Sequence, residues 1–181
     1  MQIPLVMTVL GKDRPGLVES IASLVSTHGG NWLESRMCRL GGEFAGILRI
    51  HVPAENQAAL ERALSSVGNQ GLSVIAQPDP GQPQAAGARL ASLEIVGQDR
   101  PGIVRQISAA LARQGVNVEE FSSECASAPM SGETLFKAHI KMQIPASCVV
   151  ADLRLELEKI AGDLLVDVAF EEWLTPPRHL T

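Results

Sequence analysis

The sequence predicts an α+β protein built from two consecutive βαββαβ units. The first observation behind this prediction is an internal repeat, because the segment Gly11–Val18 (GKDRPGLV) returns as Gly97–Val104 (GQDRPGIV). The second is that the matches continue in order along the chain, since Phe44–Pro53 corresponds to Phe136–Pro145 at a longer offset. A chance match of one octapeptide would not be followed by ordered matches across the whole half. We therefore interpret the chain as two homologous domains.

Between the copies, the segment 77–87 is rich in proline and glycine and has no apolar period, which is typical of a linker. We expect a first domain over residues 1–77, a linker over 78–89, a second domain over 90–174 and a C-terminal tail over 175–181. The longer offset in the second copy indicates extra residues around 127–132.

Each copy begins with a strand followed by a helix. The expected first strands are Leu5–Leu10 and Leu90–Val96, and the helix of the first copy runs from Pro15 to His28. One face of each helix is apolar, which is the helical period. The residues on these faces are Leu17, Ile21, Leu24 and Val25 in the first copy and Ile103, Ile107, Ala110 and Leu111 in the second.

Three further strands and one helix complete each copy. The second strand starts at Asn31 or Asn117, and the third strand alternates between apolar and polar residues as a half-buried strand does. Pro53 and Pro145 are expected to open the second helix. The last strands are expected at Leu72–Ala76 and Leu164–Phe170. A βαββαβ unit closes as a four-stranded antiparallel sheet with both helices on one face, the ferredoxin-like arrangement.

Composition excludes several functional classes. Hydrophobic residues make up 45% of the 181 residues and charged residues 19%, which is enough for folded cores. The net charge of −5 has the wrong sign for coating nucleic acid or an anionic membrane. Three cysteines without a C-x-x-C pair favour a reducing compartment, and the apolar N-terminus is too short for a membrane span. We expect a soluble, cytoplasmic protein that binds neither DNA nor membranes directly.

The junction between the first strand and the first helix is the candidate binding site. Its residues are Gly11, Asp13, Pro15 and Gly16 in the first copy and Gly97, Asp99, Pro101 and Gly102 in the second. Free N–H groups at a helix start can take a carboxylate. The aspartate, together with Asn31 or Asn117, could take an ammonium group. The pattern therefore suits a zwitterion such as an amino acid.

A purely structural interpretation stands beside this one. Asp13 and Asp99 are good helix caps, and capping alone would explain them. Asn31 and Asn117 could occupy the left-handed turn between helix and strand. The sequence leaves both interpretations open.

Catalytic and metal-binding patterns are missing from the sequence. It contains no nucleophile elbow, zinc-protease motif, Walker loop or dinucleotide-binding loop, and we expect no catalytic residues, no cofactor and no metal. Arg36, Arg39 and Arg49 form a local basic cluster, which we interpret as a solvated strand face. The cysteines are interpreted as small buried apolar residues.

The repeated Gly-x-Asp-Arg-Pro-Gly-[Leu/Ile]-Val motif, followed by an aliphatic helix and Gly-x-Asn, resembles the ACT domain. The resemblance covers nearly the whole chain twice, and a tandem of this length is similar to the glycine cleavage system transcriptional repressor family. It implies a ferredoxin-like fold and an amino-acid effector, glycine or serine. The ligand positions it implies are Gly11, Asp13, Asn31, Gly97, Asp99 and Asn117.

The resemblance also implies a regulator that acts through a partner transcription regulator rather than by touching DNA. A homodimer is left open. The alternative to an amino-acid sensor is an interaction or dimerisation module whose loops bind nothing. One departure from the family is Trp32, which follows Asn31 where a small aliphatic residue is usual and could narrow the first pocket.

Overall fold

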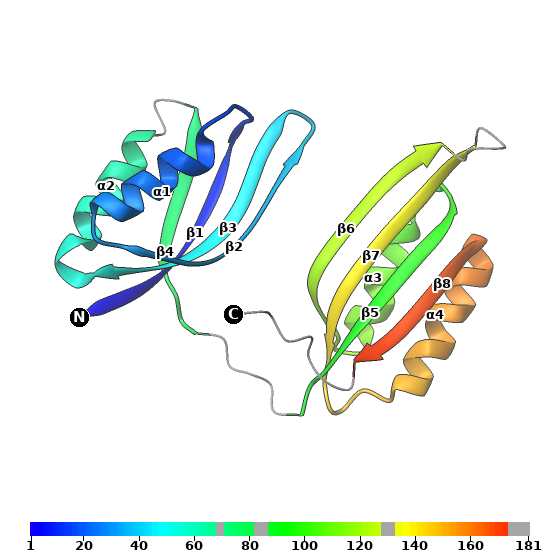
Figure 1. The fold of residues 1–181 in the computed structure, drawn as a ribbon. Helices are drawn as coiled ribbons and strands as arrows, with labels where there is room; N and C mark the ends of the chain where they lie inside the picture. The colour runs from blue at the N-terminus through cyan, green and yellow to red at the C-terminus, as the bar shows by residue number, and fades with distance from the viewer. Residues whose placement is uncertain (68–70, 82–86, 128–132, 174–181) are drawn as a thin grey trace. The chain divides into compact units, whose positions relative to one another are not determined.

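The computed structural model divides the chain into two compact units, Met1–Gln82 and Pro83–Thr181. The structure describes residues 1–67, 71–81, 87–127 and 133–173 (Figure 1). The predicted tail at 175–181 and most of the predicted insertion, residues 128–132, lie outside the described residues. Within the described residues, no helix combines the length and the apolar character that crossing a membrane requires.

The first unit has the predicted order of elements. They are β1 (Gln2–Lys12), α1 (Leu17–Thr27), β2 (Asn31–Leu40), β3 (Glu43–Pro53), the short 3-10 helix η1 (Ala54–Asn56), α2 (Gln57–Val67) and β4 (Leu72–Pro78). The strands form one antiparallel sheet in the order β2-β3-β1-β4. Both helices cover the same face of this sheet (Figure 1).

The second unit repeats this plan. Its elements are β5 (Arg89–Gln98), α3 (Ile103–Arg113), β6 (Asn117–Ser127), β7 (Thr134–Ile144), α4 (Val150–Leu164) and β8 (Val166–Trp173). Its sheet order, β6-β7-β5-β8, matches that of the first unit strand for strand. The predicted fold class, α+β with two ferredoxin-like units in tandem, is confirmed. β4 ends at Pro78, the first residue of the predicted linker, and β5 begins at Arg89, its last residue.

Each unit has a core of its own between its sheet and its helices. The predicted helix stripes are buried there, as are alternate residues of the third strands, because a strand turns successive side chains to opposite faces. In the second unit, five alternate residues of the third strand are buried: Phe136, Ala138, Ile140, Met142 and Ile144. Trp32 also packs against the core of its unit, so its indole ring is accounted for by the fold rather than by a pocket.

Several element boundaries differ from the prediction. The first helices start at Leu17 and Ile103, two residues after the prolines. The second helix of the second unit starts at Val150, because Pro145–Cys148 first make a turn closed by the N–H of Cys148 and the carbonyl of Pro145. The expected left-handed asparagines were wrong: among the described residues the only non-glycine with positive φ is Leu165, and Gly29 and Gly115 make those turns instead.

Candidate functional site

The two strand–helix junctions have the same backbone geometry. Gly16 precedes α1 with φ of 89°, and Gly102 precedes α3 with φ of 101°. These left-handed conformations are why both positions are glycine. The backbone N–H of Ser20 and its hydroxyl both donate to the carbonyl of Gly16, at 2.9 Å each. Pro15 and Gly16 therefore form the turn that leads into the helix rather than the first helical turn.

Neither aspartate caps a helix. No side chain makes a capping hydrogen bond at either helix start in the described residues, so the alternative that Asp13 and Asp99 are N-caps was wrong. The N–H groups of a first helical turn have no partner within their own helix and carry the positive end of the helix dipole. In addition, a Cβ built at Gly16 meets no atom within 4 Å. Backbone donors and open space thus occur together at this junction.

Gly11 and Gly97 have a structural role. A Cβ at Gly11 would lie 2.4 Å from the carbonyl oxygen of Gly71, and one at Gly97 would lie 2.7 Å from the Cα of Val166. The last strand of each unit begins against these glycines, so packing within the unit explains them without a ligand.

The backbone N–H of each aspartate is hydrogen-bonded to the hairpin formed by the second and third strands of its unit. The N–H of Asp13 donates to the carbonyl of Gly42 at 3.0 Å, and the N–H of Asp99 donates to that of Thr134 at 2.9 Å. These bonds hold the backbone of the junction in place while leaving the carboxylate groups to make their own contacts.

The two carboxylates differ in their partners. Arg39 Nε lies 2.5 Å from Asp13 Oδ2, in an ion pair at the end of β2. The strand pairing places Cys125 at the position of Arg39 in the second unit, since Arg39 pairs with Phe44 and Cys125 with Phe136. No arginine therefore occupies this position, and within the described chain no ion pair holds the exposed Asp99. The junction of the second unit keeps a free acceptor for an ammonium group.

Asn31 and Asn117 lie away from the junctions. Asn31 pairs with His51, and His51 pairs with Pro4 near the start of β1, whereas Asp13 follows the end of β1. Eight residues of strand separate Pro4 from Lys12, or about 26 Å at about 3.3 Å per residue. One small amino acid cannot span this distance. The prediction that aspartate and asparagine of one unit hold the same ammonium group was therefore wrong.

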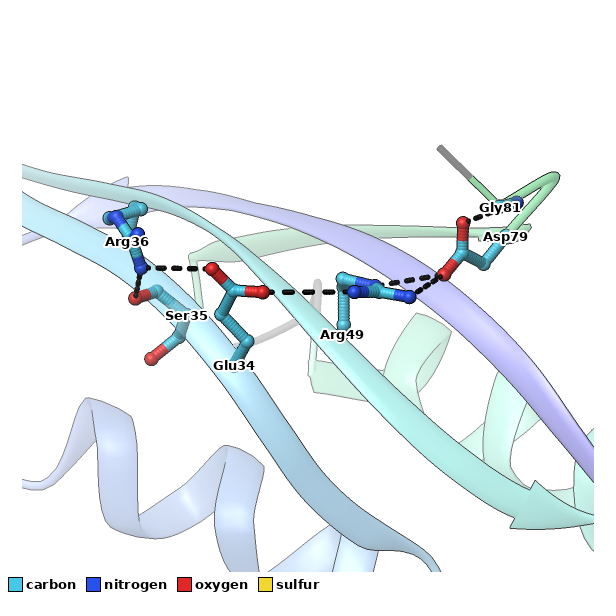
Figure 2. A network of polar contacts seen from close by, with 6 residues as sticks. All are labelled: Glu34, Ser35, Arg36, Arg49, Asp79 and Gly81. Carbon is cyan, nitrogen blue, oxygen red and sulfur yellow. Dashed lines mark hydrogen bonds and ion pairs between the residues drawn. The ribbon is translucent and has the colours of Figure 1, made fainter. Parts of the chain in front are cut away.

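The basic cluster of the first unit is neutralised by carboxylates (Figure 2). Arg36 pairs with Glu34, and Arg49 pairs with both Glu34 and Asp79. Because Arg39 pairs with Asp13, all three predicted arginines have an acidic partner within the unit. This arrangement does not offer a surface for phosphate groups. The interpretation of one solvated strand face holds for Arg36 and Arg49, which lie on the helix-free face, but was wrong for Arg39, which pairs with Phe44 on the other face.

Asp79 is the most strongly held of these acids, with a side chain 7% exposed. The N–H of Gly81 donates to Asp79 Oδ1 at 2.9 Å and Arg49 donates to Oδ2, and both contacts lower the pKa of Asp79. The same pairing raises the pKa of Arg49. This contact joins β3 to the segment that follows β4, and sequence patterns did not indicate it.

The three cysteines differ in their exposure to solvent. Cys148 is buried, as expected, but Cys38 and Cys125 are exposed, so the interpretation of all three as buried residues was wrong for two of them.

The described residues contain no group of three or more histidine, cysteine or acidic side chains placed to hold a metal ion. A shallow hollow of about 340 Å³ lies on the helix-free face of the second sheet, next to Glu94, Lys137 and His139, and no junction residue lines it.

Comparison with known proteins gives the same division of the chain. Residues 4–74 and residues 91–154 each match the ACT domain. The glycine cleavage system transcriptional repressor of Escherichia coli K12 is 26% identical over 163 residues, which cover 88% of this chain and 85% of the repressor. The phosphoserine phosphatase SerB2 of Mycobacterium tuberculosis is 22% identical over 176 residues, and the match spans 41% of that enzyme.

A solved structure extends the similarity to the whole fold. The crystal structure of an unknown protein from Galdieria sulphuraria has a TM-score of 0.82 and 29% identity, and the match covers 96% of this chain and all of that one. The two domain matches together cover well over half of the residues. The chain therefore belongs to the ACT-domain family and carries two ACT domains in tandem.

Proposed function

We propose that this protein is a non-enzymatic, cytoplasmic amino-acid sensor that controls transcription of glycine cleavage genes through a partner transcription regulator. The observation that carries the proposal is the pair of uncapped helix starts behind left-handed glycines, at Gly16 and Gly102. The similarity over most of both chains to a repressor of this system supports the biological setting.

The ligand we propose is a small amino acid, glycine or serine, bound by its carboxylate to the first-turn N–H groups. The second junction is the stronger site, because Asp99 can pair with the ammonium group while Asp13 already pairs with Arg39. Glycine has five heavy atoms, and at a best case of about 1.5 kcal/mol per atom its binding free energy is limited to about 7.5 kcal/mol. This limit corresponds to a dissociation constant of a few micromolar, and contacts short of the best case should weaken binding to roughly tens of micromolar or more.

Calorimetric titration of the full chain with glycine, serine and the other amino acids tests this function. We expect binding of a small amino acid, and we expect Asp99→Asn to weaken it at least tenfold. Asp13→Asn is the matched control and should change affinity little. Neither substitution removes a helix cap, so both variants should fold. If no amino acid binds at millimolar concentration, the junctions are structural and the chain is an interaction module.

The output we propose is a contact with a protein rather than with DNA. Residues 1–84 carry six basic and seven acidic side chains, and residues 85–181 carry nine and thirteen, so neither half is basic. Binding about six phosphates needs that many converging cations, and the three arginines of the first sheet are already paired. In a mobility-shift titration at about 0.15 M salt, we expect a shift of target promoter DNA only when the regulator is present. A specific shift by this protein alone would refute the partner mechanism.

A further inference from the structure

The helix-free face of the first sheet is apolar at its centre. Leu10 is 55% exposed, Ile47 53% and Ile75 56%, and all three side chains point away from the helices. Thr8 pairs with Ile47 on one side and with Ile75 on the other, while Leu10 pairs with Ala45. Residues directly opposite on paired strands have Cβ atoms about 5 Å apart. These side chains therefore form one continuous patch, which we call the sheet-1 patch.

The same face of the second sheet carries different residues. Strand pairing gives the equivalent positions, and their residues are mostly charged or polar. Thr8, Leu10, Ala45, Ile47 and Ile75 correspond to Glu94, Val96, Lys137, His139 and Ala169. A sheet with one solvated face carries polar residues on that face. The second sheet follows this rule and the first does not, although both sheets have the same topology.

The helix-free faces of the two sheets differ in charge, and this difference indicates which kind of partner the first face can bind. Around the sheet-1 patch, Glu34 and Asp79 balance Arg36 and Arg49 in ion pairs, so the surface is apolar and neutral. The face of the second sheet has an acidic excess over its two lysines, Lys137 and Lys141; the acids are Glu94, Glu120, Glu124, Asp167 and Glu171. A neutral apolar face attracts neither nucleic acid nor a charged peptide, but it is complementary to an identical neutral face.

The size of the face suits a dimer interface. Four strands about 4.8 Å apart, with the eleven residues of the longest strands rising about 3.3 Å each, give a face of roughly 19 by 36 Å. This is roughly 700 Å², close to the roughly 800 Å² that each partner contributes to a standard interface. We propose that the sheet-1 patch packs against the same patch of a second copy of this chain, sheet on sheet about a two-fold axis.

Sedimentation velocity of the full chain over a concentration series tests the dimer. We expect the unaltered protein to sediment as a dimer at micromolar concentration. Leu10→Glu should raise the dimer dissociation constant at least tenfold, because it places a charge within the apolar patch. Val96→Glu is the matched control at the equivalent position of the second sheet and should leave the dimer intact. A monomer at every concentration, or a dimer that Leu10→Glu leaves unchanged, would refute the proposal.

Thiol labelling gives a second measurement on the same face. Cys38 is exposed and pairs with Ala45 on the helix-free side of the first sheet, whereas Cys125 pairs with Phe136 and projects from the other side of its sheet. We expect the rate at which a maleimide labels Cys38 to fall as protein concentration rises, while the rate at Cys125 stays constant. In the Leu10→Glu variant both rates should be independent of concentration. If Cys38 is labelled at the same rate at all concentrations of a dimeric protein, the dimer uses another surface and the proposal is wrong.

Discussion

Arg49 donates a hydrogen bond from Nε to Asp79 Oδ2 at 2.8 Å, and its Nη2 lies 2.7 Å from the same oxygen in an ion pair. The other carboxylate oxygen of Asp79 accepts the N–H of Gly81, and the N–H of Asp79 donates to the carbonyl of Pro4. The chain leaving β4 is thereby fixed to β1 and β3, and Figure 2 shows its contact with Arg49 of β3. The contact is charge-assisted and its acid is shielded from solvent, so it is worth more than an exposed ion pair.

Asp79→Asn should lower the melting temperature of the first unit in a pH-dependent way. The pKa of Asp79 is lowered in the folded protein, first by the N–H of Gly81 and then by Arg49. Its stabilising effect is therefore complete well above the unfolded pKa of about 3.9 and is lost as pH falls through the lower folded pKa. Circular dichroism melting curves should show a constant deficit for the variant between about pH 5 and 8, and a shrinking one below about pH 4.

Glu34→Gln provides the comparison for that measurement, since Glu34 lies in the same network but its side chain is 52% exposed. Its melting temperature should stay close to that of the unaltered protein. A deficit for Asp79→Asn that does not shrink as pH falls below about 4, or one no larger than that of Glu34→Gln, would show that the carboxylate charge does not stabilise the unit.

Gly97→Ala should destabilise the second unit by about 1–3 kcal/mol, the usual cost of overpacking. The added methyl group would lie 2.7 Å from the Cα of Val166, and backbone cannot move aside as a flexible side chain can. Gly162→Ala is the control in the same unit: it lies in α4 with nothing within 4 Å. That substitution should stabilise by about 0.5–1 kcal/mol because alanine favours helix. Denaturant titration measures both, and equal effects at the two sites would contradict the packing role.

Arg39→Ala should make the first junction resemble the second. Removing the guanidinium frees the Asp13 carboxylate for an ammonium group, so the proposed sensor should bind its amino acid at the first unit more tightly, by roughly three- to tenfold for a gain of about 1 kcal/mol. Calorimetry on the Asp99→Asn background isolates this site. Unchanged affinity there would mean that Asp13 does not contact the ligand.

Cys148 should resist alkylation while Cys125 reacts. Burial raises the pKa of the Cys148 thiol, which lowers the fraction of reactive thiolate and also blocks the reagent. Timed iodoacetamide labelling followed by peptide mass spectrometry should show Cys125 labelled first and Cys148 labelled only after unfolding in urea. Equal rates in the folded protein would place Cys148 at the surface.

The fold was predictable because the sequence repeat and the spacing of apolar residues are both local patterns, and both indicate the same elements in the same order. The core stripes of α1 and α3 and the alternation in β3 and β7 follow from side-chain spacing alone. The starts of the first helices were displaced because proline fits both a first helical turn and the turn before it. The left-handed φ of Gly16, which decides between the two, is not visible in the residue type.

The candidate site was predictable only in part, since its geometry depends on contacts between distant segments. The Asp-Arg-Pro-Gly junctions were located correctly, but the pairing of Arg39 with Asp13 depends on the register of β2 against β3. The separation of Asn31 from Asp13 follows from the direction in which α1 returns along the sheet. Neither relationship has a signature in the linear pattern of residues.

The two cores have no residue in common, because each unit closes its own sheet and helices around its own apolar side chains. A substitution that empties one core therefore leaves the packing of the other unchanged. A destabilising substitution in one core should therefore unfold that unit and leave the other unit folded. Its calorimetric unfolding will then follow two steps, and one melting temperature will not describe it.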